Sequence, residues 1–460
     1  MNLIILLGGA VFFFFALIRK PEIIAVILFT FVIARINFDL KGLPLNLRAI
    51  MSLALFVRII TDKSAKKNYS GFVAEPNIKI LIFFLIYVIF VSFSQDLFTI
   101  DLLKESINIV LTTFCLYYFY FKSGSPLQLK SALIAAGIIC FADLAYTYIA
   151  FGAFPVHRIY FLFTGLDAGL SDEEMDLLTN WNFFGQICGM CFVYCLSDYI
   201  RDRTTNKISL WVMPFMFMGV LMSTSRSSIL GLLIVSILII MNGINYEEQK
   251  RKITKIFSFS VGAVVMGFLL YAAFGKYVNL DSKFVDEIVS RMAQEPIAVL
   301  NRAMGQSYDI HNLGSMDWRE ESSENAYKAY MNLNLREQLF GIGNGGFEAR
   351  NYGHGYNAHN AILLLLIENG ILGFSIYVLL VGGTIVQCIV NKNFSPSLAV
   401  VVFILIYGLG QNREWSSITT LLFVTCMTAE LRMLRLKKYE QRSKADNPVR
   451  HLFTKQGKTS

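Results

Sequence analysis

The sequence predicts an all-α integral membrane protein with about 12–13 transmembrane helices and one large helical extracytoplasmic loop. Apolar residues make up 55% of the 460 residues, and 39 residues are Phe. The mean hydropathy of +0.52 exceeds what the surface of a soluble globular protein tolerates. The apolar residues also occur in blocks of membrane length. These observations exclude a soluble enzyme.

The blocks that we expect to span the membrane are long enough, with their polar flanks, to cross the hydrocarbon layer. They are Leu3–Ile18, Ile23–Ile33, Ile80–Phe93, Ile107–Phe121, Ala132–Phe151, Phe183–Leu196, Leu210–Met222, Ile229–Met241, Ile256–Phe274, Ile371–Val390, Leu398–Leu409 and Leu421–Leu434. The run Ala49–Ile60 is a weaker candidate because Arg58 interrupts it. The first span is followed by Arg19-Lys20 without a small-residue cleavage signal, so we expect an anchor rather than a removable signal peptide.

Basic segments alternate with acidic or nearly neutral loops along the chain. Lys and Arg gather at residues 63–67, 122–130, 201–207, 250–255, 392 and 435–458. This alternation satisfies the positive-inside rule if the C-terminus is cytoplasmic, and it accounts for most of the net charge of +8. The long loop over residues 275–358 and the turn at Arg226 then lie on the outer side. Because the basic residues are scattered without interleaved aromatic residues, we exclude a nucleic-acid surface.

We expect one polytopic membrane domain over residues 1–436, including the large loop 275–358, and a basic, disordered cytoplasmic tail over residues 437–460. Apolar residues recur at helical spacing around residues 284–292 and 326–331, which predicts two amphipathic helices within the loop. All seven Cys fall in apolar spans, so no disulfide framework is implied. Packing explains Cys188, Cys191 and Cys195 better than a metal site, because no His or carboxylate joins them.

His359 is the first candidate for chemistry. It stands just before an apolar helix that starts at Ala361 and whose N-terminal end points to the outer space. A helix N-terminus carries partial positive charge and free amide donors, which favour a neutral imidazole and attract anions. Such a His suits a general base that removes a proton from a sugar hydroxyl. The alternative is an interfacial His that caps its helix.

Two arginines are candidates for anion binding. Arg226 lies between two spans in the segment Ser223–Ser228, among hydroxyl groups suited to phosphate. Its place on the outer side, where Lys and Arg are disfavoured, indicates a ligand; the alternative is a juxtamembrane arginine that snorkels to the interface. Arg319 precedes the aromatic helix of the loop. Chemistry alone does not single it out, because the loop contains other arginines: Arg291, Arg302, Arg336 and Arg350.

Residues Gly341–Gly346 match the GxGxxG pattern literally. A dinucleotide site also needs a preceding strand and a βαβ unit, which the surrounding sequence lacks, so we interpret the run as a tight turn that brings backbone amides near a ligand or the next helix. Glu368, a carboxylate within an apolar run, is either close to the membrane interface or a buried functional group, and Asn369-Gly370 indicates a break in that helix. Tyr356 is one of several loop aromatics that could stack on sugar rings; packing onto the membrane face is the alternative.

The order of these pieces is more specific than any one of them. A Ser-Arg-Ser turn precedes a long outer loop, in which an Arg stands before an aromatic helix and the run Leu339–Phe347. His359-Asn360 follows, and Glu368–Gly373 opens the next span. Over residues 223–374 this arrangement resembles the O-antigen polymerase and O-antigen ligase superfamily.

The resemblance implies a C-type glycosyltransferase fold and an inverting glycosyl transfer that needs neither metal nor cofactor. The donor it implies is an undecaprenyl-pyrophosphate-linked glycan at the periplasmic face of a bacterial inner membrane. It assigns activation of the acceptor hydroxyl to His359, and two fixed guanidinium groups would neutralise the leaving pyrophosphate. The expected substrate-binding residues are Arg226, Arg319, Asn360, Gly343 and Tyr356.

Polymerase and ligase share these features. We favour a polymerase, whose acceptor is another lipid-linked repeat unit, because polymerases are the more divergent proteins and the match thins outside the loop. The alternatives are a ligase that transfers the glycan to lipid A-core, and a transporter of lipid-linked sugars. A transporter needs a charged path through the spans, where ionisable residues such as Asp143 and Arg58 are few. Expected partners are the donor, the acceptor, membrane lipid, a chain-length regulator and a flippase.

Overall fold

The computed structural model confirms the predicted all-α fold class. It describes residues 16–36, 47–62, 65–151, 181–201, 207–223, 225–244, 248–255, 304, 316–352, 358, 360–409 and 417–446. These ranges contain helices and turns and no strand. Five of the described helices are long and apolar enough to cross a membrane, and three shorter apolar helices accompany them. The total of 12–13 spans stays a prediction, because Ile256–Phe274 and most of Leu3–Ile18 lie outside the described residues.

Most of the described helices contain a predicted apolar block, whereas α4 (Ala65–Ala74) forms in a stretch where no span was predicted. They are α2 (Pro21–Ile33), α3 (Leu47–Ile60), α4 (Ala65–Ala74), α5 (Pro76–Ser94), α6 (Ile100–Ser123), α7 (Leu127–Phe151), α10 (Trp181–Arg201), α11 (Lys207–Met222), α12 (Arg226–Ile244), α16 (Met316–Asn332), α17 (Leu335–Phe340), α18 (Gly346–Ala349), α19 (Ala361–Val390), α20 (Pro396–Gly408) and α21 (Ile418–Asp446). Proline starts α2, α5 and α20, where its missing N–H and fixed φ suit the first helical turn.

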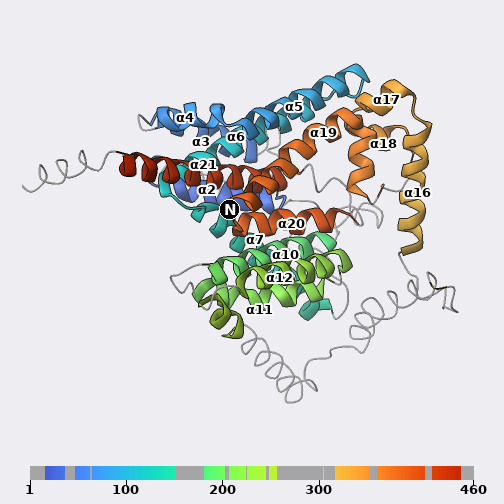
Figure 1. Cartoon of the computed structure of the whole chain (residues 1–460). Coiled ribbons are helices and arrows are strands. Elements are labelled where there is room, and N and C mark those ends of the chain that lie inside the picture. Colours follow the sequence, from blue (N-terminus) through green and yellow to red (C-terminus); the bar gives the residue numbers. More distant parts are fainter. Residues whose placement is uncertain are drawn as a thin grey trace, which may run out of the picture.

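The helices form a bundle with two ends, which we call the loop end and the basic end. The loop end contains the C-terminus of α5 and the N-termini of α10, α12 and α19; the basic end contains the opposite termini of the same helices. In Figure 1, α16, α17 and α18 lie together at the right of the view, beside the loop end. The helices that belong to the outer loop are therefore stacked on one end of the bundle.

Basic residues from distant parts of the chain meet at the basic end. Lys122 Nζ lies 2.7 Å from a Glu22 carboxylate oxygen, and Lys130 Nζ lies 2.6 Å from Asp198 Oδ2. Asp198 is one turn from Arg201, the last residue of α10. These basic segments, which alternate with acidic or neutral loops along the sequence, therefore lie at one end of the folded bundle.

An ion-pair network at the basic end ties α21 to α4, α5 and α6. Glu75, which is 6% exposed, accepts a hydrogen bond from Arg432 at 3.1 Å and another from Arg435 at 2.6 Å. Arg432 also donates to the Tyr117 hydroxyl at 2.9 Å and to the Gly71 carbonyl. One carboxylate thus holds two guanidinium groups between four helices.

The C-terminal helix is longer than the sequence predicted. α21 continues through residue 446, so the disorder expected from residue 437 onward is not seen over residues 437–446. The physical reason is that Lys, Gln, Arg, Glu and Ala propagate a helix that is already nucleated. Residues 447–460 lie outside the described part of the chain.

Close contacts between small residues pack α10 against its neighbours. A Cβ added to Gly219 of α11 would lie 2.6 Å from Cys188 Sγ, and one added to Gly137 of α7 would lie 3.1 Å from Cys191 Sγ. Membrane helices commonly use small residues in this way, because lipid provides no hydrophobic force between them. These two cysteines therefore act as packing residues, as the sequence predicted.

We predict that Glu75→Gln destabilises the folded protein in detergent by about 1–3 kcal/mol, because it removes the charge of a buried carboxylate that pairs with both Arg432 and Arg435. The measurement is the midpoint of thermal unfolding. Asp101→Asn is the matched control, since Asp101 pairs with Lys104 while its side chain is 87% exposed and exposed pairs contribute little. Equal midpoints for the two variants would contradict the role given to Glu75.

Candidate functional site

A break at Gly370 divides α19 into two helical segments. Gly370 has φ 63° and ψ −178°, a combination essentially restricted to glycine. A Cβ at this position would collide with the Leu339 carbonyl oxygen and lie 2.5 Å from the Gly341 nitrogen. The break that Asn369-Gly370 predicted is confirmed, and it is the place where the glycine turn (residues 341–346) approaches the helix.

Backbone amides of the glycine turn donate hydrogen bonds to α19 next to its break. Gly343 N donates to the Glu368 carbonyl oxygen at 2.9 Å, and Gly345 N donates to Glu368 Oε1 at 2.8 Å. The Glu368 side chain is 3% exposed. The sequence left open whether the turn approaches a ligand or the next helix, and these bonds confirm contact with the next helix. The GxGxxG match therefore has a packing role here.

Helix α5 holds the other side of the glycine turn. The Tyr87 hydroxyl lies 2.9 Å from the carbonyl oxygens of both Phe340 and Asn369, and Asn344 N donates to Ser92 Oγ at 2.9 Å. Sequence reasoning did not single out Tyr87 or Ser92, because about 250 residues separate them from their partners and no local pattern marks such a contact.

Arg350, one of the alternatives for the second anion-binding arginine, is engaged within the protein. Its Nη1 lies 2.8 Å from a Glu337 carboxylate oxygen, and its Nη2 donates to Gln95 Oε1 at 3.1 Å. Arg336 is exposed at the start of α17, and Arg302 lies outside the described residues. We therefore assign Arg350 a structural role within the loop.

Helix α16 packs against the residue that precedes His359. Ser323 Oγ donates to the Ala358 carbonyl oxygen at 3.3 Å, and Ala326 on the same helix is fully buried. Arg319 stands one turn before Ser323, which corresponds to about 6 Å along the helix axis. The fold therefore brings the backbone of Arg319 close to the segment that carries the proposed base.

Asn360 caps α19. Its side-chain oxygen accepts hydrogen bonds from Ile362 N at 3.0 Å and Leu363 N at 3.2 Å, which satisfies two amides of the first turn. The described contacts of Asn360 are those of a helix cap, while its expected contact with substrate stays a prediction. His359 and Tyr356 lie outside the described residues.

The Ser-Arg-Ser turn connects α11 to α12. Arg226 is the half-buried first residue of α12. The neighbouring hydroxyls bind within the turn: Ser228 Oγ donates to Ser225 Oγ at 2.9 Å, and Ser225 N donates to Ser223 Oγ at 3.3 Å. A Cβ at Gly185 of α10 would collide with Ser223 Oγ. The buried serines therefore shape the turn and its contact with α10.

Arg35 is a cation at the loop end that sequence reasoning missed. Its guanidinium carbon lies 4.4 Å from the centre of the Phe183 ring, a cation–π geometry. Phe183 stands two residues before Gly185, which contacts the Ser-Arg-Ser turn. A signal was present: Arg35 follows the span Ile23–Ile33 on the side where the positive-inside rule disfavours arginine, which is the argument that selected Arg226.

The loop end therefore gathers several of the predicted site residues. Residues near the C-termini of α12 and α19 line one pocket at the basic end. Arg226, the first residue of α12, and the break in α19 at Gly370 therefore both lie toward the loop end. Asn360 caps the segment of α19 that precedes the break, and α16, which includes Arg319, contacts Ala358 through Ser323.

One family model matches part of the chain. Residues 211–378 match the family model described as O-antigen ligase. This part of the chain is therefore similar to the O-antigen ligase family. The match runs from α11 through the Ser-Arg-Ser turn and the glycine turn into the part of α19 beyond its break, so it covers the pieces that carried the resemblance. No curated protein matches the chain.

We predict that Gly370→Ala destabilises the protein by about 3 kcal/mol or more, because a Cβ there adds backbone strain to a collision with the main chain of the glycine turn. The measurement is thermal unfolding in detergent, combined with protease sensitivity of the loop. Gly383→Ala on the same helix is the control: nothing lies within 4 Å of its added Cβ, so we expect no loss. Similar behaviour of both variants would contradict the role of the break.

Proposed function

We propose that this protein polymerises undecaprenyl-pyrophosphate-linked oligosaccharide repeat units into O-antigen or a related surface polysaccharide. The observation that carries the proposal is the contact between α16 and Ala358. It joins the helix of Arg319 to the residue before His359, at the end of the bundle that also bears Arg226. A base and two cations in that arrangement suit transfer of a sugar from a pyrophosphate.

The proposed reaction is a single inverting displacement. The acceptor hydroxyl oxygen attacks the anomeric carbon of the donor, and the bond from that carbon to the pyrophosphate oxygen breaks. His359 takes the hydroxyl proton, and the lipid pyrophosphate leaves with the electron pair. A positioned base contributes typically about two to four orders of magnitude in rate; holding donor and acceptor together supplies much of the remainder.

Arg226 and Arg319 are proposed to bind the pyrophosphate. Guanidinium groups suit this task because they stay charged and present several donors in a fixed plane. Stabilisation of the charge that develops on the leaving group lowers the barrier without a metal ion. Arg35, near the turn of Arg226, adds positive charge at the same end of the bundle.

The loop end is proposed to face the periplasm of a bacterial inner membrane, with the C-terminus in the cytoplasm. The support is the gathering of Lys and Arg at the other end, including Lys122, Lys130, Arg201 and the arginines of α21, as the positive-inside rule requires of the cytoplasmic side. A C-type glycosyltransferase fold would then present its site to a lipid-linked donor at the outer surface.

We predict that His359→Ala abolishes chain extension while the protein remains folded and membrane-inserted. The assay supplies purified protein with the lipid-linked repeat unit alone and resolves product length on a polysaccharide gel. His354→Ala is the matched control, because His354 lies five residues earlier in the same loop and has no proposed role. Unchanged chain lengths in the His359 variant would eliminate the proposed base.

The same assay separates polymerase from ligase, because the family match supports both. A polymerase forms a ladder from the repeat unit alone, since a second lipid-linked unit is its acceptor. A ligase forms product only when lipid A-core is added. Product that requires lipid A-core would overturn the polymerase proposal and leave the proposed chemistry of the site in place.

We predict that Arg226→Ala lowers the rate at limiting donor by about 100-fold or more, by analogy with removal of one charge-stabilising donor from an active site. Arg226→Lys should retain more activity, since it keeps the charge and loses only the planar donor geometry. Initial rates across donor concentrations measure this effect, with Arg251→Ala as a control at the basic end. If the wild type, both Arg226 variants and the Arg251 variant are equally active, Arg226 does not bind the pyrophosphate.

A further inference from the structure

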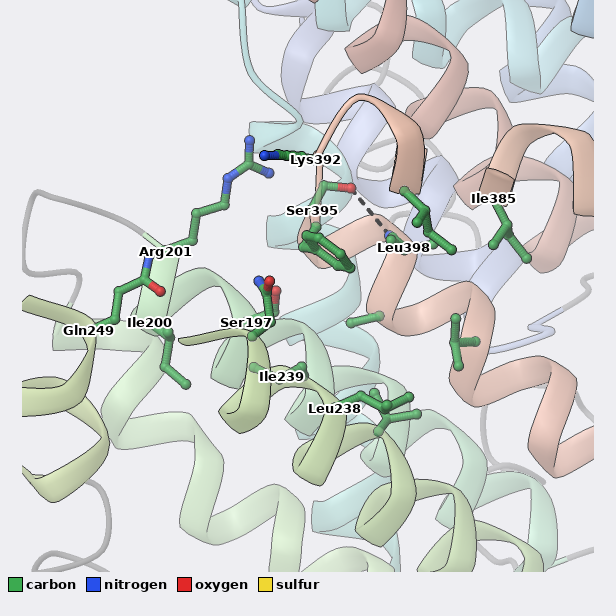
Figure 2. Close-up of a pocket in the computed structure, with 16 residues that line it drawn as sticks. Ser197, Ile200, Arg201, Leu238, Ile239, Gln249, Ile385, Lys392, Ser395 and Leu398 are labelled. Atoms are coloured by element: carbon green, nitrogen blue, oxygen red, sulfur yellow. Dashed lines mark hydrogen bonds between the residues drawn. The ribbon is translucent and has the colours of Figure 1, made fainter. Parts of the chain in front are cut away.

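A cavity of about 700 Å³ lies at the basic end, between α10, α12, α19 and α20. Figure 2 shows Arg201 and Lys392 reaching toward the same end of the cavity, while Leu238 and Ile239 form the opposite wall. The cavity therefore has one cationic end and one aliphatic side. It shares no residue with the site proposed for glycosyl transfer.

Two basic side chains line the cationic end of the cavity. Among the residues that the structure describes, its lining includes Arg201 and Lys392 and contains no carboxylate. Arg201 Nη2 donates to Asn393 Oδ1 at 2.9 Å, and Asn393 in turn donates to Glu430 Oε2 at 3.3 Å. Glu430 is 7% exposed and lies behind the lining, where it offsets part of the charge of Arg201. Lys392 adds a second cation, so an anion at this end is favoured.

A helix N-terminus points at the same region. Ser395 is the N-cap of α20, and its hydroxyl accepts a hydrogen bond from Leu398 N at 3.3 Å. The amides of a first helical turn and the aligned peptide dipoles attract anions. Ser197 and Gln249 add polar groups to the lining. The polar end is thus built from several separate chain segments, and the anion site does not depend on the helix dipole alone.

The aliphatic side of the cavity continues onto the outer surface of the bundle. Leu238 is 51% exposed and Ile389 is 50% exposed, and both belong to helices that are apolar enough to cross a membrane. A hydrocarbon chain placed in the cavity would therefore remain in contact with the lipid phase. The cationic end lies at helix termini, which is the level of lipid headgroups.

We propose that this cavity binds one anionic phospholipid, with its phosphate between Arg201 and Lys392 and an acyl chain along Leu238 and Ile389. A basic pocket between membrane helices is a suitable receptor for such a headgroup. The site lies on α10 about 24 Å, along the helix axis, from Gly185 at the loop end. The lipid is therefore a resident of the opposite membrane face and not the glycan donor. The proposal does not rest on the proposed function.

The test measures lipid retained by the purified protein in detergent, using native mass spectrometry with added phosphatidylglycerol or phosphatidylcholine. We expect one phosphatidylglycerol per chain, at an affinity at least about fivefold above that of phosphatidylcholine. Lys392→Asn should weaken phosphatidylglycerol binding about fivefold, as expected for loss of one cation near a headgroup. Asn suits this position because Lys392 has φ 52°, a region that Asn tolerates. Arg201→Gln should have a similar effect.

Arg251→Gln provides the control, since Arg251 is an exposed cation at the same end that does not line the cavity. It should leave phosphatidylglycerol binding unchanged. Equal binding of the two lipids, or equal binding by wild type and the Lys392 variant, would overturn the proposal. A further experiment adds inorganic phosphate as a competitor of phosphatidylglycerol. Complete displacement of the lipid by inorganic phosphate at the lipid concentration would identify a site for free phosphate and would also overturn it.

Discussion

The backbone hydrogen bonds at the break in α19 constrain much of the loop end. A helix that stops inside an apolar run leaves carbonyl groups without partners, and such groups are costly where water is scarce. In this protein the carbonyls of residues 367 and 368 accept from the amides of residues 342 and 343, and the carbonyl of residue 369 accepts from the Tyr87 hydroxyl. The glycine turn and α5 therefore satisfy the last turn of the first segment of α19.

This constraint explains why the turn and the break occur together in the sequence. The turn can approach the helix only if side chains are absent at Gly341 and Gly370, because a Cβ on either would collide with the main chain of the other segment. The pattern that looks like a nucleotide motif thus has a packing origin. Its consequence for function is indirect: it positions the first segment of α19, whose cap at Asn360 directly follows the proposed base.

The two ends of the bundle carry different groups of cations. At the loop end, Arg35 stacks on Phe183 of α10 and Arg226 begins α12, and the glycosyl transfer is proposed to take place there. At the basic end, many cations are arranged in ion pairs such as that of Glu75, and the remaining charge surrounds the cavity at Lys392. Lipid contacts at one end and glycan transfer at the other are therefore compatible within the same set of membrane helices.

The all-α membrane class, most helix boundaries, the break at Gly370 and the order of the family signature were all predictable from the sequence. These features depend on apolar periodicity, Pro, Gly and charge placement, which are local. The contacts of Tyr87 and Ser92 with the glycine turn, the cation–π pair of Arg35 and the cavity at Lys392 were decided by tertiary structure. Each of them joins residues that are far apart in the chain, and a local pattern carries no information about which distant helix will become the neighbour.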